Sequence, residues 1–329
     1  MKAIAPGKVI LSGEHSVVYG APAIALAVTE HIQATFQPDN SGYLSIDTGE
    51  ADIYRLAGDQ LPALKNQCDL RYHAFEAGKQ SVSCLLDHAQ DLLLYALAQQ
   101  ESLPSGCLST TSTLPTGSGM GSSAAAIAAT LLLSEQLTGR PRTLSERFEL
   151  VRYCERLQHG RGSAIDAAAV TYGGLVRVQQ NQISHLDCHL GEGWYRVNTG
   201  QPSVTTGQCV EAVRQAFASS SIWSEFAAIT DQFIDALSDP DTLKTLLSAN
   251  HQLLERIGVV PEPVAAFIRQ VELQGGAAKI SGAGAHQGKG GGLVLLYLPE
   301  GHAQDLCETF AYSCSPLKED SLGARSIND

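Results

Sequence analysis

The stretch that decides the fold is Leu114-Pro-Thr-Gly-Ser-Gly-Met-Gly-Ser-Ser-Ala-Ala-Ala-Ile127. Its three glycines, Gly117, Gly119 and Gly121, stand at alternate positions, and glycine suits the interior of neither a helix nor a strand. The alanine- and leucine-rich run at residues 122–133 strongly favours a helix. A loop that enters a helix N-terminus presents free backbone N–H groups at the positive end of the helix dipole. The stretch therefore predicts an anion site suited to phosphate, with a serine N-cap on a buried helix as the alternative.

A lysine that neutralises phosphate must come from another segment, because the Gly-x-x-x-x-Gly-Lys-Ser/Thr spacing of a Walker A loop occurs nowhere in the chain. Lys8 is a candidate, since it lies between apolar Ile4 and Ile10 and next to Pro6-Gly7. A lysine in such a strand is either a solvated charge or a group held for a purpose, and the sequence leaves both interpretations open.

Composition excludes several classes of partner. The 329 residues carry a net charge of −12 and are 44% hydrophobic, which indicates a globular protein with two lobes or domains. The negative charge argues against nucleic acid or an anionic membrane as the main partner. Eight scattered cysteines with no Cys-x-x-Cys pair and no secretory signal are expected to be reduced, in a cytoplasmic monomer or homodimer.

Hydrophobic periodicity predicts an α+β chain with one lobe at residues 1–190 and a second at 191–329. Residues 2–22 are expected to form a strand, a bend and a second short strand, and residues 61–80 give no clear signal. The other predicted strands are 23–36, 42–47, 51–56, 106–114, 175–179, one ending near 190, and 194–199. The predicted helices are 81–100, 122–137, 145–159, 206–219, 222–237, 241–256, 262–273 and 300–311, followed by a loose tail from residue 315.

Two further segments carry candidate chemistry. Asp166 is the one charge in the run at 164–170, so it is either an N-cap or a working carboxylate, and the cost of unpaired burial favours the second. Glu155 and His159, four residues apart on a predicted helix, share one face. A second glycine-rich loop, 282–292, joins two predicted strands and is either a flexible hairpin or, with Lys279 and Lys289, a clamp on an anionic ligand.

Three segments together resemble the three motifs of the GHMP small-molecule kinases: Ala5–Gly20, Pro115–Ala125 and Lys279–Gly284. The first of them, and the segment from Glu155 to Gly174, look like the mevalonate kinases within that family. The resemblance covers essentially the whole chain. It implies a two-lobed α+β fold, with a ribosomal-protein-S5-like N-terminal lobe that binds ATP, a C-terminal α/β sandwich lobe, and the site in the cleft between them.

The resemblance also implies ATP- and Mg²⁺-dependent phosphorylation of the 5-hydroxyl of mevalonate, which gives 5-phosphomevalonate and ADP for isoprenoid synthesis. Asp166 would accept the hydroxyl proton beside Lys8, and Ser123 and Glu155 would hold Mg²⁺. The ATP phosphates would bind the loop made of Gly117, Ser118, Gly119, Met120, Gly121, Ser122 and Ser123. The substrate side would comprise Lys8, Glu14, His15, Asp166, Thr206, Ser281, Gly282, Ala283 and Gly284, the last four closing over the site.

The chain departs from the mevalonate kinases near the acceptor. Their usual Asn-Pro-Ser-Gly-x-Asp is Arg161-Gly-Ser-Ala-Ile-Asp166 here, and the third motif continues as 285–292 with a further lysine. The alternatives are therefore another GHMP enzyme (phosphomevalonate kinase, diphosphomevalonate decarboxylase or homoserine kinase) and a non-catalytic ligand-binding relative. The joint presence of Lys8, Ser123, Glu155 and Asp166 argues against the non-catalytic relative.

Overall fold

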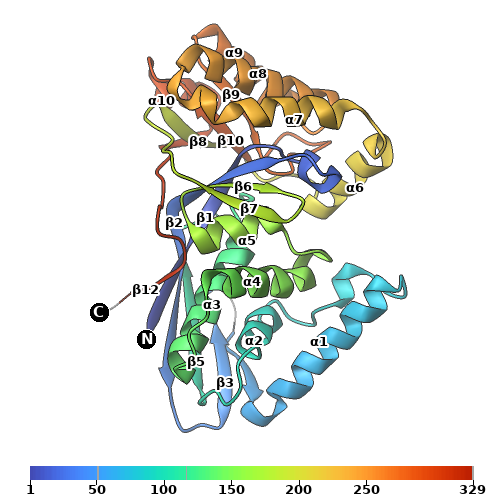
Figure 1. The fold of residues 1–329 in the computed structure, drawn as a ribbon, viewed down its shortest axis with the longest axis vertical. Helices are drawn as coiled ribbons and strands as arrows, with labels where there is room; N and C mark the ends of the chain where they lie inside the picture. The colour runs from blue at the N-terminus through green and yellow to red at the C-terminus, as the bar shows by residue number, and fades with distance from the viewer. Residues whose placement is uncertain (50–51, 116, 328–329) are drawn as a thin grey trace.

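The computed structural model describes residues 1–49, 52–115 and 117–327. Two β-sheets follow one another along the long axis of the molecule, and helices cover both of them (Figure 1). The lower sheet holds strands from the first 186 residues of the chain, and β12 (Arg325–Ile327) returns to it from the C-terminal end. The mixed α+β class predicted from the sequence is confirmed.

Strand β2 (Ala23–Pro38) organises the first sheet, because it is long enough to pair with different strands along its two halves. Its beginning pairs with β6 (Leu175–Gln179), its end pairs with β5 (Gly106–Ser112), and β1 (Lys2–Ser12) runs antiparallel beside it. Within the described residues the order is β12-β1-β2-β5-β3-β4, with β6 paired to β2 and β7 paired to β6. The other strands are β3 (Tyr43–Asp47), β4 (Tyr54–Ala57) and β7 (Gln182–Leu186).

Helix α3 (Ser122–Thr138) packs directly on β1 and β2, and it is largely buried because alanine and leucine occupy most of its sides. Further helices lie around α3, and some of them pack against the sheet as well (Figure 1). They are α1 (Leu61–Glu76), α2 (Asp91–Leu97), α4 (Leu144–His159) and α5 (Ala164–Tyr172), with short 3₁₀ helices η2 (Gly58–Gln60) and η3 (Val82–Cys84). Helix α3, which follows the glycine loop, is therefore at the centre of the part of the molecule that contains the first sheet.

The second sheet is antiparallel with the order β11-β8-β10-β9, and its helices lie together at the top of Figure 1. Its strands are β8 (Trp194–Asn198), β9 (Ala277–Ser281), β10 (Leu293–Tyr297) and β11 (Ser313–Pro316). Its helices are α6 (Thr206–Phe217), α7 (Ile222–Phe233), η4 (Asp235–Ser238), α8 (Pro240–Arg256), α9 (Glu262–Leu273) and α10 (Ala303–Thr309). No helix in the part of the chain that the structure describes has the length and apolar character of a membrane span.

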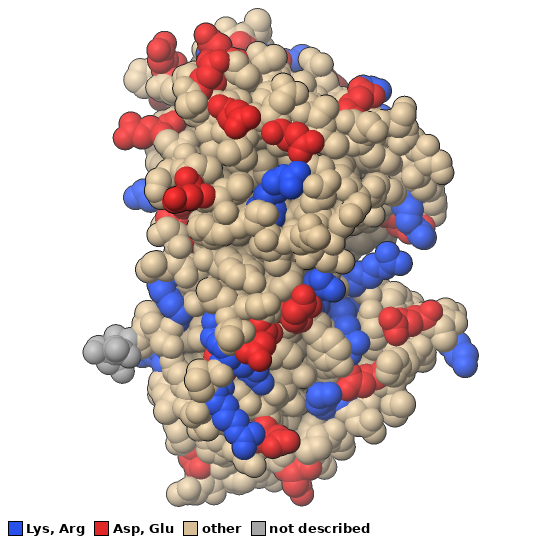
Figure 2. Space-filling model, viewed as in Figure 1, with Lys and Arg blue, Asp and Glu red and all other residues tan. Residues whose placement is uncertain are grey.

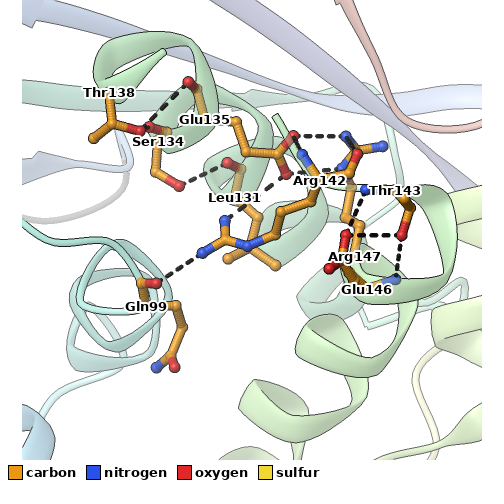
Figure 3. Close-up of polar contacts among 9 residues, drawn as sticks. All are labelled: Gln99, Leu131, Ser134, Glu135, Thr138, Arg142, Thr143, Glu146 and Arg147. Carbon is orange, nitrogen blue, oxygen red and sulfur yellow. Dashed lines mark hydrogen bonds and ion pairs between the residues drawn. The ribbon is translucent and has the colours of Figure 1, made fainter. Parts of the chain in front are cut away.

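A buried ion pair fastens α3 to α4 (Figure 3). The Arg147 guanidinium donates two hydrogen bonds to the Glu135 carboxylate, of 3.1 and 2.7 Å. The backbone N–H of Arg142 donates to the same carboxylate (3.1 Å), and its guanidinium donates to the carbonyl oxygen of Gln99 (2.7 Å). Thr143 and Glu146 form a capping box at the start of α4. These contacts fix the helix whose far end carries Glu155.

Three local predictions are wrong or incomplete. Residues 81–100 do not form one helix, because the Asp91 carboxylate accepts hydrogen bonds from the N–H groups of Asp87 and His88 and holds a turn before α2. Strand β1 runs through a register shift at Pro6/Gly7, and η1 (Ser16–Tyr19) replaces the predicted second short strand. The unplaced segment 61–80 contains α1. Ala51, at the start of one predicted strand, lies outside the described residues.

The prediction of a loose tail from residue 315 is also wrong for residues 315–327. Strand β11 pairs with β8, and β12 pairs with β1. Between them, the buried Asp320 carboxylate accepts hydrogen bonds from the N–H groups of Leu322 and Gly323 and from Arg325. A single aspartate thus orders the connection that ties the end of the chain to both sheets.

Candidate active site

The glycine loop leads into an uncapped helix N-terminus. Gly117, Gly119 and Gly121 have φ angles of 68°, 71° and 72°, a region that favours glycine. Gly121 is the N-cap residue of α3, and no side chain among the described residues caps this N-terminus. The alternative of a serine N-cap is therefore wrong. Within the described part of the chain the N–H groups at the start of α3 are left without a side-chain cap, as an anion site requires.

Lys8 reaches this loop from strand β1. Its backbone N–H donates to the carbonyl oxygen of Met120 (2.9 Å), and its Nζ donates to that of Gly119 (2.8 Å). The same ammonium lies 2.9 Å from Oδ1 of Asp166. Lys8 is 4% exposed. A Cβ on Gly121 would lie 3.1 Å from Cγ of Lys8, so the third glycine also makes room for the lysine. The charge is held in place by these contacts and is not solvated.

The turn between α4 and α5 brings two carboxylates to the same place. Gly160 ends α4 in a left-handed conformation, and Ser163 caps α5 by accepting a hydrogen bond from the N–H of Asp166 (3.2 Å). The N–H of Ser163 donates to Oε2 of Glu155 (3.3 Å). Asp166 therefore lies in the first turn of α5, is not its N-cap, and is directed towards Lys8.

Glu155 is buried between the glycine loop and Asp166. It is 1% exposed, and its Oε1 accepts a hydrogen bond from the Ser123 hydroxyl (3.1 Å). Burial and, after it, the negative charge of Asp166 raise the pKa of Glu155 to about 8. Oδ1 of Asp166 is buried and accepts no hydrogen bond from the described residues beyond its ion pair with Lys8. With Glu155 ionised, the cluster would carry two negative charges against the single positive charge of Lys8.

These donors suit a hard dication. Mg²⁺ prefers oxygen ligands and is usually bound through one or two carboxylates together with phosphate oxygens. The Ser123 hydroxyl and the two carboxylates supply protein oxygens beside an uncapped helix N-terminus. Burial raises the pKa of Glu155, and a bound dication would favour its ionised form. The residues present therefore fit Mg²⁺.

The surface is indented between the upper and lower parts of the molecule, at the right-hand edge of Figure 2, where Lys and Arg side chains stand on the rim. A separate hollow of about 540 Å³ lies lower, against α1 and the loop at 98–105, and is lined among others by Leu61, Lys65 and Leu103. None of the predicted site residues lines that hollow, so it belongs to the scaffold and not to the site.

Glu14 and His15 lie where β1 meets the second sheet. Glu14 is 1% exposed and forms an ion pair with Lys279 of β9, so its charge faces the protein interior. The Nε2–H of His15 donates to the carbonyl oxygen of Ala283 (2.9 Å). Burial lowers the pKa of His15 to about 4, so the ring is neutral near pH 7 and its Nδ1 is an acceptor.

The predicted closing segment is anchored. The Ser281 hydroxyl accepts a hydrogen bond from the N–H of Ile10 (2.8 Å), and the thiol of Cys209 joins His15 in donating to Ala283. Gly282 and Gly284 have φ angles of 102° and 65°. Thr206 is exposed at the start of α6, and no contact between described residues joins it to Asp166.

Sequence reasoning missed the partner of Glu14. Lys279 was considered only as part of a clamp on a ligand, whereas it is a buried residue of strand β9. The signal was available, because residues 277–281 read Ala-Ala-Lys-Ile-Ser, and a lysine inside an otherwise uncharged strand requires a partner. Which carboxylate would meet it depends on how the two sheets pack.

Residues 86–174, from the end of η3 to the start of β6, match the family model of the GHMP kinases N terminal domain. This part of the chain is therefore similar to the GHMP kinases. The matched segment contains the glycine loop, α3, Glu155 and Asp166, and Lys8 joins them from outside it.

The relatives extend this result along the chain. A mevalonate kinase of the archaeon Thermococcus onnurineus is 29% identical over 317 residues, which cover 91% of this chain and 89% of that protein. The structure of the Methanococcus jannaschii mevalonate kinase superposes with a TM-score of 0.78 over 97% of this chain and 98% of that one, at 20% identity. A Lactococcus lactis galactokinase gives the same TM-score at 14% identity, covering 99% and 95%. The fold is therefore the GHMP kinase fold, and it is shared by enzymes named for different acceptors.

Proposed function

We propose that this protein transfers the γ-phosphoryl group of ATP to the 5-hydroxyl of mevalonate, giving 5-phosphomevalonate and ADP. One observation carries the proposal: Lys8 bridges the glycine loop and Asp166 directly in front of the uncapped N-terminus of α3. The relatives of similar length that are named mevalonate kinases support the choice of acceptor. Mevalonate phosphorylation places the enzyme in the synthesis of isoprenoid precursors.

In this mechanism Asp166 accepts the proton of the attacking hydroxyl. Its carboxylate has one oxygen that is paired only with the ammonium of Lys8. Lys8 holds Asp166 in position, and its own charge stabilises the negative charge that spreads over the transferred group. Because Lys8 also binds the glycine loop, the base and the phosphate site keep a fixed geometry. Phosphoryl transfer depends mainly on such positioning and charge stabilisation.

The nucleotide half follows from the loop. Backbone N–H groups at residues 117–123 and the dipole of α3 would bind the phosphates of ATP. Ser118 and Met120 have buried side chains, so they would contribute through the backbone, while Gly117 and Gly119 are exposed. The Ser123 hydroxyl and Glu155 would hold Mg²⁺, which when bound neutralises phosphate charge. Deprotonation of Glu155 would then accompany binding of the metal.

The acceptor half is the neighbourhood of Lys8, Asp166, His15 and the turn at 282–284. The neutral His15 would accept a hydrogen bond from a substrate hydroxyl at Nδ1. Glu14, Ser281 and Thr206 remain predicted substrate-side residues, of which Glu14 and Ser281 are buried. We also retain as proposals the lobes at 1–190 and 191–329, a cytoplasmic location, which the eight free cysteines support, and a monomer or homodimer.

A coupled assay for ADP release tests the proposal. The purified protein is given ATP, Mg²⁺ and, in separate reactions, mevalonate, 5-phosphomevalonate, homoserine and a few sugars, and release of CO₂ from diphosphomevalonate is measured in parallel. We expect turnover with mevalonate that requires both ATP and Mg²⁺. Turnover with another acceptor and none with mevalonate would overturn the assignment. A protein that binds ATP and turns over no acceptor would instead be a non-catalytic relative.

A further inference from the structure

Strand β9 and the turn after it contact the end of β1 through alternate residues. Lys279 forms an ion pair with Glu14 and also donates to the carbonyl oxygen of Ile10 (3.3 Å). Ser281 accepts from the N–H of Ile10 (2.8 Å), and the carbonyl oxygen of Ala283 accepts from His15 (2.9 Å). Every second residue of a strand lies on one face. One face of the second sheet thus contacts the strand that carries Lys8.

The ion pair is the buried centre of these contacts. The side chain of Lys279 is 0% exposed and that of Glu14 is 1% exposed, so neither charge has access to bulk water. Burial raises the pKa of Glu14 and lowers the pKa of Lys279, and the opposite charge of the partner counteracts both shifts. Removal of one partner would leave the other charge uncompensated in the interior. The pair therefore binds the segments on either side of it firmly to one another.

The segment that Glu14 anchors is in a costly conformation. Gly13 has a φ of 95°, and a Cβ there would lie 2.4 Å from the carbonyl oxygen of Pro22. His15 has a φ of 57°, which is unfavourable for a residue with a side chain. Such a turn persists only where its surroundings impose it. Glu14 on one side of His15 and the Ala283 carbonyl that accepts from its ring supply that constraint.

We propose that Lys279 and Glu14 are positioning residues for the acceptor side of the site. They fix His15 and the turn at 282–284 relative to Lys8 and Asp166, and Glu14 exerts its effect through Lys279 without contacting the substrate. This inference rests on the proposed function for the identity of the acceptor. The nucleotide side, built from 117–123 and Glu155, lies outside these contacts and does not depend on them.

The test is a double-mutant cycle on the full-length protein. Glu14→Gln, Lys279→Met and the double variant are compared with the wild type for the KM of mevalonate, kcat, and the Kd of a fluorescent ADP analogue. Each single variant is expected to raise the KM of the acceptor about tenfold, with the Kd for nucleotide within about twofold of the wild type. The double variant, which leaves no lone buried charge, is expected to recover part of the loss.

The buried pair Glu135–Arg147 is the matched control, because it is equally internal and lies away from the acceptor. Glu135→Gln is expected to lower thermal stability and to leave the KM of mevalonate within about twofold. If Lys279→Met does not fold, Ser281→Ala takes its place, with an expected rise in acceptor KM of about threefold.

An unchanged acceptor KM in a folded variant would overturn the inference, as would a parallel loss of nucleotide affinity. Turnover of mevalonate by the wild type distinguishes failure of this inference from failure of the proposed function. If the wild type does not turn over mevalonate, the proposed function is wrong, and the cycle is then run with the acceptor that the panel of substrates identifies. If the wild type turns over mevalonate normally and the variants keep the wild-type KM for the acceptor, only the positioning roles of Glu14 and Lys279 are wrong.

Discussion

Two buried clusters of charge lie in the lower part of the molecule, and they differ in how completely their oxygen atoms are paired. At the Glu135 cluster (Glu135, Arg142 and Arg147), both carboxylate oxygens accept hydrogen bonds from the arginines (Figure 3). The Lys8 cluster (Lys8, Glu155 and Asp166) holds two carboxylates and one lysine. Lys8 forms an ion pair with Asp166, and Oδ1 of Asp166 accepts no hydrogen bond from the other described residues. A satisfied network stabilises the fold, whereas an incompletely satisfied one retains capacity for a ligand.

The helix N-termini repeat this difference. Helix α4, which belongs to the Glu135 cluster, begins with a capping box in which Thr143 and Glu146 satisfy each other's N–H groups. Helix α3 begins at Gly121 with no side-chain cap. Helix α5, which carries Asp166, is capped by Ser163, so it is the helix after the glycine loop whose N–H groups are left for an anion.

The substitution with the largest expected effect tests whether the Lys8 cluster, and not the Glu135 cluster, is responsible for catalysis. Asp166→Asn removes the proposed base and should lower kcat about 10³-fold, because the acceptor hydroxyl then loses its proton acceptor. The Kd for ATP, measured by calorimetry, should change by less than about threefold, since the glycine loop is intact. A variant with nearly wild-type kcat would show that Asp166 does not take the proton.

The reciprocal change should act on stability alone. Glu135→Gln leaves the buried Arg147 without a full countercharge and should lower the unfolding free energy by about 3 kcal/mol. Equilibrium urea unfolding measures the loss, and kcat/KM is measured at a temperature where the variant is folded. We expect kcat/KM within about twofold of the wild type. A large loss of activity in the folded variant would mean that the Glu135 cluster also positions the site.

A pH series tests the incomplete pairing of Glu155. Its pKa in the folded protein, about 8, is raised from 4.5, so the folded state binds this proton more tightly than the unfolded state. The stabilisation is fully present below the unfolded pKa and is lost as the pH rises from about 4.5 to about 8. Unfolding of the ligand-free protein should show a loss of about 5 kcal/mol from this group.

Glu155→Gln is the control for that series, because Glu14 also has a raised pKa and contributes in the same direction. The difference between wild type and variant should isolate the slope that belongs to Glu155. A slope identical in both proteins would contradict the assignment. Mg²⁺–ATP binding should release protons in the same pH range, measured by calorimetry in buffers of different ionisation enthalpy.

The smallest effect concerns the caps. Thr143→Ala removes the side-chain cap of α4 and should cost about 1 kcal/mol of unfolding free energy, with unchanged kcat. Gly121→Ala, at a φ of 72° and against Lys8, should weaken ATP binding as well as stability. Equal behaviour of the two variants in nucleotide affinity would remove the distinction between a capped structural helix and an uncapped binding helix.

Much of the site could be predicted because short stretches of the sequence determine its chemistry. The alternate glycines required positive φ angles, and the run after Gly121 could only be a helix. Lys8 and Asp166 were each a single charge in an apolar segment. The segment at 81–100 failed because its helical spacing competes with a turn that the Asp91 side chain stabilises. Residues 315–327 failed because their order depends on strands far away in the sequence.

The pairing of Glu14 with Lys279 could not be predicted from the local sequence, for the same reason. The two residues are separated by most of the chain, and each has a second plausible interpretation, as a substrate contact or as part of a clamp. Only the packing of β9 against the end of β1 decides between them. Long-range contacts of this kind determine how the acceptor half is held, while the nucleotide half follows from one continuous motif.

A crystal structure of the protein with Mg²⁺, a non-hydrolysable ATP analogue and mevalonate tests the central claim most directly. We expect the phosphates to bind the N–H groups at 121–123, with the terminal phosphate beside Lys8. We expect the metal at Ser123 and Glu155, and the 5-hydroxyl in hydrogen-bond contact with Asp166. A nucleotide bound elsewhere, or an acceptor whose hydroxyl lies away from Asp166, would contradict it.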